Sequence, residues 1–164
     1  AQHFSGRGIT DRNETLWVSW VIVTPSHRLF FSGDSGYFPG FKQVGDKYGP
    51  FDMTFIECGA YGAAWPKVHM FPEQTVQAHL DLRGKLLHPI HWGTFNLALH
   101  PWYEPMERLV AAAVDSRVHI ATPVAGETVQ YGKTNGTQRW WRHAMTEHEN
   151  IKKRPAQLTL KEND

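Results

Sequence analysis

The sequence predicts a layered α/β domain. Runs of β-branched and aromatic residues, each as long as a typical strand, alternate with segments whose apolar residues recur at helical spacing. This alternation is typical of a sheet covered by helices. The chain has 164 residues, of which 41% are hydrophobic, so it is long enough for one domain with a core of its own.

Composition and charge exclude several classes of protein. The single cysteine excludes a disulfide-stapled scaffold and a cysteine-rich zinc site, so a bound metal would have to use histidine and carboxylate ligands. The formal net charge of +1 gives no reason to expect a nucleic-acid partner. No apolar run approaches the roughly 18 residues of a membrane span, and no export leader is visible. We therefore expect a cytoplasmic protein without a transmembrane segment, and association with a membrane surface stays an open alternative.

The first half of the chain is predicted to form three strands and one helix. Residues 16–23 are rich in Val, Ile and Trp and end before Pro25, and residues 28–32 form a second such run, so the two are expected to pair as a hairpin. Residues 41–48 have the spacing of a short helix, which Gly49-Pro50 ends. The apolar run at 51–56 is typical of a strand inside a buried sheet.

The second half is predicted to contain two helices and further strands. After a loop at 57–71, Pro72 and Glu73 begin a helix, because proline fits the first turn and an acid interacts favourably with the helix dipole there. Its helical spacing is set by Thr75, Val76, His79 and Leu80. Residues 85–90 are the fourth strand, and 104–114 is the clearest amphipathic helix, with an apolar face of Met106, Leu109, Val110, Ala113 and Val114. Short closing strands are expected at 118–120 and 127–130.

Beyond residue 131 the pattern weakens. Trp140-Trp141 is an isolated aromatic pair, and residues 147–164 mix charges with little periodicity. We therefore assign residues 1–131 to the domain and 132–164 to a C-terminal tail or packing arm.

Two strand ends carry a polar residue beside glycine. Asp34 lies between Gly33 and Ser35-Gly36, and His91 precedes Trp92-Gly93. Loops at strand ends are where α/β proteins gather functional groups. Together with His3, these side chains are of the kind that zinc, iron or manganese accept as ligands. Each one alone has an ordinary explanation, since an Asp between glycines is a common turn residue and a lone His is commonly a hydrogen-bonded polar group.

Several motifs in order resemble the metallo-β-lactamase superfamily. They are AQHFS at 1–5, LWVSW at 16–20, FFSGDSGY at 30–37, GPFD at 49–52, GAY at 59–61, PE at 72–73 and IHWGTF at 90–95. Within the superfamily, the sequence is similar to the branch of N-acyl-phosphatidylethanolamine phospholipase D-like and RomA-like proteins. The resemblance covers roughly residues 1–130.

The resemblance implies a four-layer αββα sandwich that holds two metal ions, commonly zinc, beside which a phosphodiester, lactone or amide is hydrolysed. His3, Asp34 and His91 match metal ligands of the family, and Asp34 matches the aspartate that bridges both ions. His69 matches a histidine near the substrate, so Asp34 and His69 are the catalytic candidates. An ordinary histidine in a surface loop is the alternative for His69.

One family motif is missing from the sequence. The early His-x-His-x-Asp-His motif, which supplies the other ligands, does not occur in the 164 residues. We therefore expect residues 1–131 to be the C-terminal half of the sandwich, with zinc binding incomplete or absent in this chain alone. A sheet face would then need a cover, which could be a second copy of the chain, a complementing N-terminal fragment or the aromatic tail around Trp140-Trp141.

Three functions stay open at this point. The first is the C-terminal part of a metal-dependent hydrolase acting on a phosphorylated or lipid substrate, inactive without its N-terminal half. The second is a non-catalytic, truncated half-domain that self-associates, and the third is a binding module of unrelated fold. The loop residues that could line an acyl-chain pocket, or could simply pack, are Tyr61, Trp65, His69, Trp102 and Tyr103.

Overall fold

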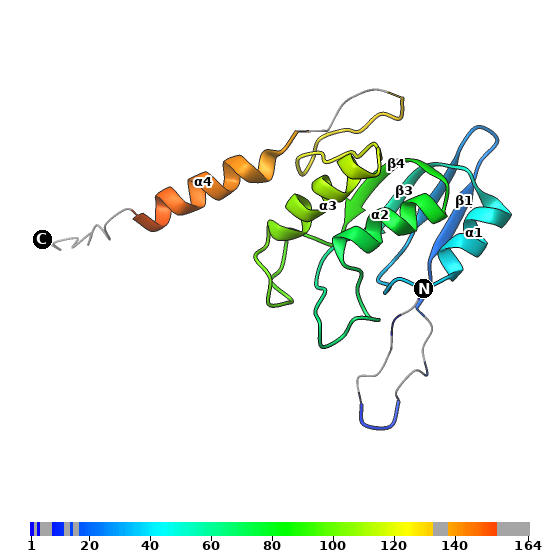
Figure 1. The fold of residues 1–164 in the computed structure, drawn as a ribbon, viewed down its shortest axis with the longest axis horizontal. Coiled ribbons are helices and arrows are strands. Elements are labelled where there is room, and N and C mark those ends of the chain that lie inside the picture. Colours follow the sequence, from blue (N-terminus) through cyan, green and yellow to red (C-terminus); the bar gives the residue numbers. More distant parts are fainter. Residues whose placement is uncertain (2, 4–7, 12–13, 15–16, 133–137, 154–164) are drawn as a thin grey trace, which may run out of the picture.

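The computed structural model describes residues 1, 3, 8–11, 14, 17–132 and 138–153 (Figure 1). Its centre is a four-stranded sheet with the order β1-β2-β3-β4. The first pair is antiparallel, whereas β2, β3 and β4 run parallel to one another. The predicted α/β fold is confirmed.

The hairpin is also confirmed, with a shorter first strand. β1 (Trp20–Val23) pairs with β2 (Arg28–Phe31), and the turn between them is closed by a hydrogen bond from Thr24 N–H to the His27 carbonyl. Residues 17–19 are irregular, and residue 16, where the strand was expected to begin, lies outside the described residues. Ser19 donates a hydrogen bond to the Ser32 carbonyl, so the chain still follows β2 before β1 begins.

The remaining strands and helices lie close to their predicted positions. They are α1 (Gly40–Tyr48), β3 (Phe51–Glu57), α2 (Pro72–Asp81), β4 (Gly84–Ile90) and α3 (Glu104–Asp115). At the start of α2, the Gln74 side chain accepts the Phe71 N–H, which satisfies a donor that the helix itself cannot use. Two apolar positions differ from the prediction, because Leu80 and Val114 are exposed at the solvent side of their helices.

The two short closing strands were wrong. Residues 118–120 contribute a single bridge, in which Leu87 of β4 bonds to the backbone of His119 and Ala121, and residues 127–130 are irregular. Pro123 lies three residues after Ile120 and has no N–H with which to extend the pairing to β4. The segment therefore borders β4 without adding a strand.

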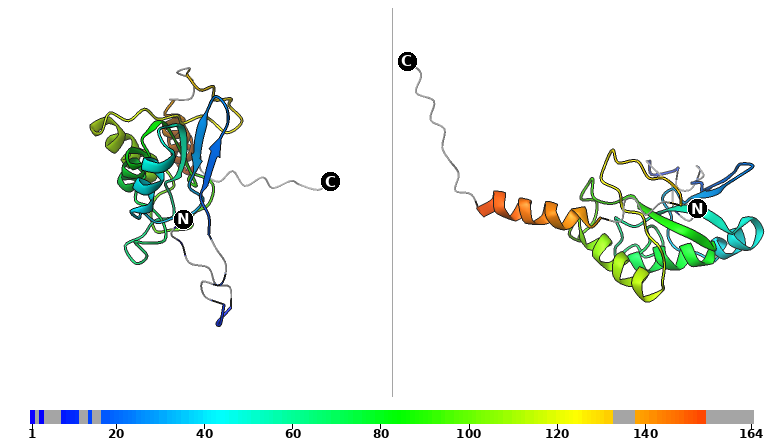
Figure 2. Two further views of the ribbon diagram at one scale, coloured as in Figure 1. Left: turned by 90° about the vertical axis from the view of Figure 1, so that its right-hand side faces the viewer. Right: turned by 90° about the horizontal axis from the view of Figure 1, so that it is seen from above.

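A helix, α4 (Trp140–Lys153), lies where the sequence showed little periodicity. Its first turn packs on the body and the rest extends away from it (Figures 1 and 2). Trp141 is fully buried and donates to Glu107 of α3 at 2.6 Å, and Arg142 makes a two-point ion pair with the same carboxylate. These contacts lower the pKa of Glu107 to about 2. The Trp140 ring stacks on Trp92 at 5.2 Å.

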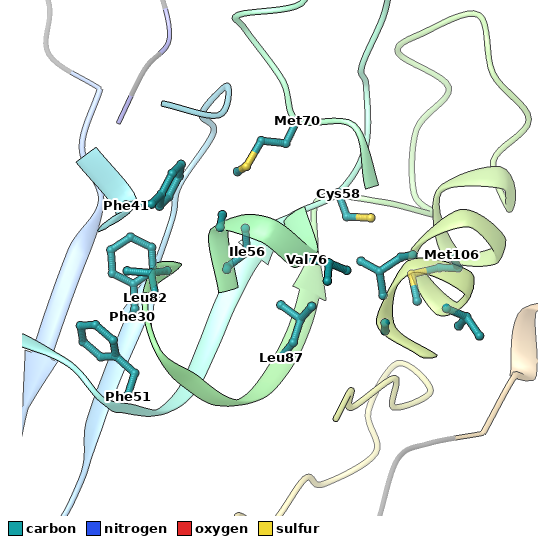
Figure 3. Packing of buried hydrophobic residues seen from close by; sticks show 14 of the residues in the cluster. Phe30, Phe41, Phe51, Ile56, Cys58, Met70, Val76, Leu82, Leu87 and Met106 are labelled. Carbon is teal, nitrogen blue, oxygen red and sulfur yellow. The ribbon is translucent and has the colours of Figure 1, made fainter. Parts of the chain in front are cut away.

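Helices α1, α2 and α3 gather on one face of the sheet (Figure 2), and the core lies between them and the strands. At one end, Phe30, Phe41, Phe51 and Leu82 cluster, and Val76, Cys58 and Met106 lie at the other (Figure 3). Alternation along the strands explains the arrangement, because neighbouring side chains in a strand point to opposite faces. In the register of the sheet, Phe30, Thr54 and Leu87 lie side by side on the face toward the helices.

The opposite face of the sheet is apolar, and none of the described helices covers it. The register places Trp20 beside Phe31, and Phe31 beside Phe55, in one row, with Ile22, Leu29, Met53 and Leu86 in the next. Trp20 is 60% exposed, Ile22 46% and Phe31 39%. We call these residues the open face. The most exposed of these side chains lie on β1 and β2, whereas Met53 of β3 is buried. An exposed apolar patch of this kind is a candidate contact surface.

Among the helices of the described ranges, none has both the length and the apolar character needed to cross a bilayer.

Replacing Trp141 by Ala is expected to lower the free energy of unfolding by about 3 kcal/mol, because the change empties a fully buried volume and leaves Glu107 without one of its donors. Urea denaturation followed by circular dichroism measures the change. Val114→Ala, on the solvent side of α3, should cost less than about 1 kcal/mol. Equal losses in the two variants would contradict this account of α4.

Stability should also depend on the protonation of His79. The ring is buried between α2 and β3, hydrogen-bonded to Thr54 at 2.7 Å, and burial lowers its pKa from 6.5 to about 4. Unfolding in acid therefore takes up a proton, so stability is full above pH 6.5 and falls as the pH drops from 6.5 to about 4, by up to about 3 kcal/mol. His79→Gln should remove this part of the pH dependence in urea denaturation, whereas His27→Gln, at an exposed turn, should keep it.

Candidate metal centre

The parallel strands bring three acidic or imidazole side chains to one edge of the sheet. Glu57 is the last residue of β3, His91 follows β4 directly, and Asp34 lies shortly after β2. Because the carboxyl ends of parallel strands meet at the same edge, residues far apart in sequence become neighbours there.

The backbone at this edge is tightly constrained. His91 has a φ of 63°, in the left-handed region that non-glycine residues rarely adopt, and such a conformation costs of order 1–3 kcal/mol. A Cβ at Gly59 would collide with the carbonyl oxygen of His91, so only glycine lets the loop after β3 lie against the loop after β4. The surrounding structure thus holds the His91 backbone in a strained conformation.

His91 lies between two carboxyl groups. Its Nε2 is 3.5 Å from Asp34 Oδ1, and its Nδ1 is 3.7 Å from Glu57 Oε2. Both distances are longer than a good hydrogen bond, and Nδ1 has no hydrogen-bond partner among the described residues. The ring therefore lies between two carboxyl groups without being saturated by them.

Glu57 is a site residue that the sequence analysis missed. Its side chain is fully buried, Oε1 accepts the Met70 N–H, and Oε2 lies 2.6 Å from His69 Nδ1. Burial raises the pKa of this carboxyl to about 9, against the opposing effect of the Met70 N–H. A carboxylate at the end of an otherwise apolar strand, directly before Cys58-Gly59, was the available signal, since Glu is almost never fully buried without a partner.

His69 connects the buried carboxyl to the cavity. Its ring stacks on that of His91, with centroids 5.0 Å apart and an angle of 18° between the planes. Burial lowers its pKa, so the neutral imidazole is favoured. The alternative of an ordinary surface-loop histidine does not fit a ring that is held on one side by Glu57 and on the other by His91.

His3 completes the group. Its ring lies edge-on to His69, with centroids 5.1 Å apart, and packs against Trp17 at 4.2 Å. His3, Asp34, His69 and His91 all line one cavity of about 410 Å³. The four candidate residues of the sequence analysis, which come from four separate segments, are thus brought together at one place.

The cavity lining is partly polar and partly apolar. Besides the imidazoles and the Asp34 carboxylate, it includes Ala60, Trp65, Val68 and Leu97. A neighbouring cavity of about 240 Å³ shares Ala60, His91 and Leu97, and includes Trp102 in its lining.

The aromatic residues of the loops divide between lining and packing. Trp65 and Trp102 line the two cavities. Tyr61 is buried, donates its hydroxyl to Glu104 and stacks on His100, and Tyr103 packs against the core. Only the first two are therefore placed to contact a ligand.

The donor set fits a divalent cation. Glu57, His69 and His91 each offer a ligand atom, and these atoms lie within 4.8 Å of one another. Imidazole nitrogen and carboxylate oxygen are ligands that zinc, iron and manganese accept. The loose approach of His91 Nε2 to Asp34, at 3.5 Å, is what a cation shared by these two groups would require.

Comparison with known proteins gives a consistent result. Residues 1–92 match the family model described as "Beta-lactamase superfamily domain". An uncharacterised protein of Mycobacterium tuberculosis is 50% identical over 145 residues, which cover 87% of this chain and 39% of that protein. Outer membrane protein RomA of Klebsiella pneumoniae is 50% identical over 93 residues, covering 57% of this chain and 70% of RomA.

A relative with a named activity is also similar. N-acyl-phosphatidylethanolamine-hydrolyzing phospholipase D 1 of Caenorhabditis elegans is 37% identical over 113 residues, covering 66% of this chain and 32% of the enzyme. Among solved structures, isothiocyanate hydrolase from Delia radicum gut bacteria superposes with a TM-score of 0.55 at 16% identity, over 69% of this chain and 43% of that one. At this identity the likeness concerns the fold alone. The chain spans about 39% of the length of the mycobacterial relative.

Proposed function

The chain belongs to the metallo-β-lactamase superfamily, in the branch of RomA and the N-acyl-phosphatidylethanolamine-hydrolyzing phospholipases D, and we propose that it forms part of the active site of a metal-dependent hydrolase. One observation carries the proposal: His3, Asp34, His69 and His91 line one cavity although they come from four separate segments. If these residues served only in local turns, nothing would require their side chains to line the same cavity.

The metal would be held by His3, Asp34 and His91, and zinc is the metal we propose. The ring nitrogens of two histidines and the oxygens of one carboxylate are a common zinc ligand set, and a carboxylate with two oxygens can bridge two cations. When bound, the cation supplies charge stabilisation and lowers the pKa of a water molecule in its coordination shell. Asp34 has only a third of its side chain exposed, so its charge acts where little solvent screens it.

His69 would handle a proton. Its Nδ1 is engaged by Glu57 at 2.6 Å, which leaves Nε2 as the ring nitrogen available to a bound substrate. Because burial lowers the pKa of His69, the neutral ring is the ready form, and a neutral imidazole can accept or pass on a proton at Nε2.

We propose that the substrate is a phosphodiester or other phosphorylated compound with an apolar arm. The side chains of Trp65, Val68 and Leu97 add apolar surface to the lining that holds the imidazoles, which suits a ligand with one polar and one apolar part. The C. elegans relative is named for hydrolysis of an N-acylated phospholipid, which has both parts. An acyl chain against Trp65 would direct the head group toward His69 and His91.

We further propose that this chain alone does not complete the site. The described donors are fewer than two four-coordinate zinc ions require. The mycobacterial relative, of which the match covers 39%, is considerably longer than this chain. The open face supports the same view, since a second sheet packed there would bury Trp20, Ile22 and Phe31. We propose that a complementing N-terminal segment occupies the open face.

A non-catalytic half-domain is the second candidate. It is favoured by the absence of a His-x-His-x-Asp-His motif from the sequence, and it would keep the fold and the open face without binding metal.

Metal binding separates the two candidates. We expect chelator-treated chain to bind zinc in competition with a chelating dye, and Asp34→Asn to weaken that binding at least about tenfold, because the amide loses the charge that holds the cation. Asp46→Asn is the matched control, since Asp46 pairs with Lys42 on the exposed side of α1. Equal zinc affinity of the wild type and Asp34→Asn would remove Asp34 from the site, and no binding by any form would favour the half-domain.

The open face should make the isolated chain self-associate. Light scattering is expected to give a mass above the 18.8 kDa of one chain, rising with concentration, because apolar surface is removed from water in the complex. Trp20→Lys should shift the mass toward the monomer, and Leu80→Lys, on the solvent side of α2, should not. A wild-type chain that stays monomeric at all concentrations would contradict a face in need of a cover.

A further inference from the structure

Glu57 lies behind the site rather than in its cavity. Its Oε2 faces the Nδ1 atoms of two imidazoles, at 2.6 Å for His69 and 3.7 Å for His91. Its side chain is fully buried, whereas the side chain of His91 is 24% exposed and that of Asp34 33%. The residues found to line the cavity include His69 and His91 but not Glu57.

The two imidazoles share one orientation. Their planes differ by 18° and each presents Nδ1 to the same carboxylate oxygen. Since Nδ1 and Nε2 lie on different edges of the ring, both Nε2 atoms are turned away from Glu57. For His91 this is direct, because its Nε2 is the atom nearest Asp34.

Glu57 is itself firmly placed. It ends β3, its backbone carbonyl accepts the Thr75 hydroxyl of α2 at 2.7 Å, and its Oε1 accepts the Met70 N–H. The carboxyl group thus binds two consecutive residues, His69 by the ring and Met70 by the backbone. In this way the end of an irregular loop is fixed to a strand of the sheet.

Burial of an acid costs free energy unless its hydrogen bonds are made. Glu57 makes such bonds, to the His69 ring and to the Met70 N–H. Its carboxyl oxygens are engaged by Met70 and His69, so a cation at Glu57 would first have to displace the ring at 2.6 Å. This arrangement matches a group that orients ligands from outside the coordination shell.

We propose that Glu57 is a positioning residue of this site, which fixes His69 by the hydrogen bond at Nδ1 and, through the stacked ring of His69, the orientation of His91, so that both Nε2 atoms face the cavity. The proposal rests on the proposed function for its consequence, because oriented Nε2 atoms matter only if a cation or substrate binds between them. The orienting contact itself is a property of the chain and can be measured without metal.

The experiment compares Glu57→Gln, Glu57→Leu and the control Glu73→Gln, whose acid pairs with Arg108 on the surface. In Glu57→Gln the amide oxygen can still accept the Met70 N–H, and the amide N–H then donates to His69 Nδ1, which forces the ring proton onto Nε2. Glu57→Leu removes both contacts. Long-range nitrogen-proton NMR of histidine rings reads the tautomer of His69, and dye competition reads the zinc affinity.

We expect a single Nε2-protonated tautomer of His69 in Glu57→Gln, and two averaged tautomers in Glu57→Leu. Zinc affinity should fall about 10–100-fold in both variants and stay unchanged in Glu73→Gln. If Glu57→Leu does not fold, as judged by circular dichroism, the tautomer in Glu57→Gln decides.

Three results would overturn the proposal. They are a mixture of His69 tautomers in Glu57→Gln, an unchanged zinc affinity in the same variant, and a complete loss of zinc binding in it, which would make Glu57 a ligand. A wild type that binds no zinc would favour the non-catalytic half-domain over the hydrolase, and the ring signals would still decide the role of Glu57.

Discussion

Parallel pairing of β2, β3 and β4 is the constraint on which the rest of the molecule depends. It puts three strand ends at one edge, so that Asp34, Glu57 and His91 meet although more than fifty residues separate the first from the last. Parallel strands need crossover connections, and here these contain α1 and α2. The same connections supply the helix layer that buries Phe30 and Leu87. The core and the site thus follow from one pairing pattern.

The rigid core is what allows an unfavourable site. His91 in the left-handed region and a fully buried Glu57 each cost free energy, and such costs are tolerated only where the surroundings fix the geometry. The fixing elements are visible: Gly59 admits the carbonyl of His91, and Thr75 of α2 binds the backbone of Glu57. Packing of α2 on β3 therefore contributes to the orientation of groups at the cavity as well as to stability.

The sequence predicted those parts of the fold in which local pattern and tertiary packing agree. The strand at 51–56 and the helix at 104–114 have the apolar spacing of their final structure and appear within one or two residues of the prediction. The strands at 118–120 and 127–130 failed because strand-like composition does not supply a pairing partner. Helix α4 was missed because, beyond the aromatic pair Trp140-Trp141, its residues are mostly polar or charged.

The site shows the same division. His3, Asp34, His69 and His91 were proposed from short motifs that resemble those of the family, and the structure places all four at one cavity. Glu57 belongs to none of these motifs. The role we propose for it depends on the His69 ring, which only the folded structure brings against its carboxyl group.

The two faces of β4 connect the open face to the cavity. Leu87 points to the helices, His88 points to the open face beside Phe55, and His91 follows as the first residue beyond the strand. If an N-terminal segment covers Phe31 and Phe55, as we propose, its end at β4 would lie next to His91. A second sheet on the open face would bring its own strand ends, or the loops between them, toward the rim of the same cavity. Covering the open face and completing the ligand set would then depend on each other, because β4 borders both.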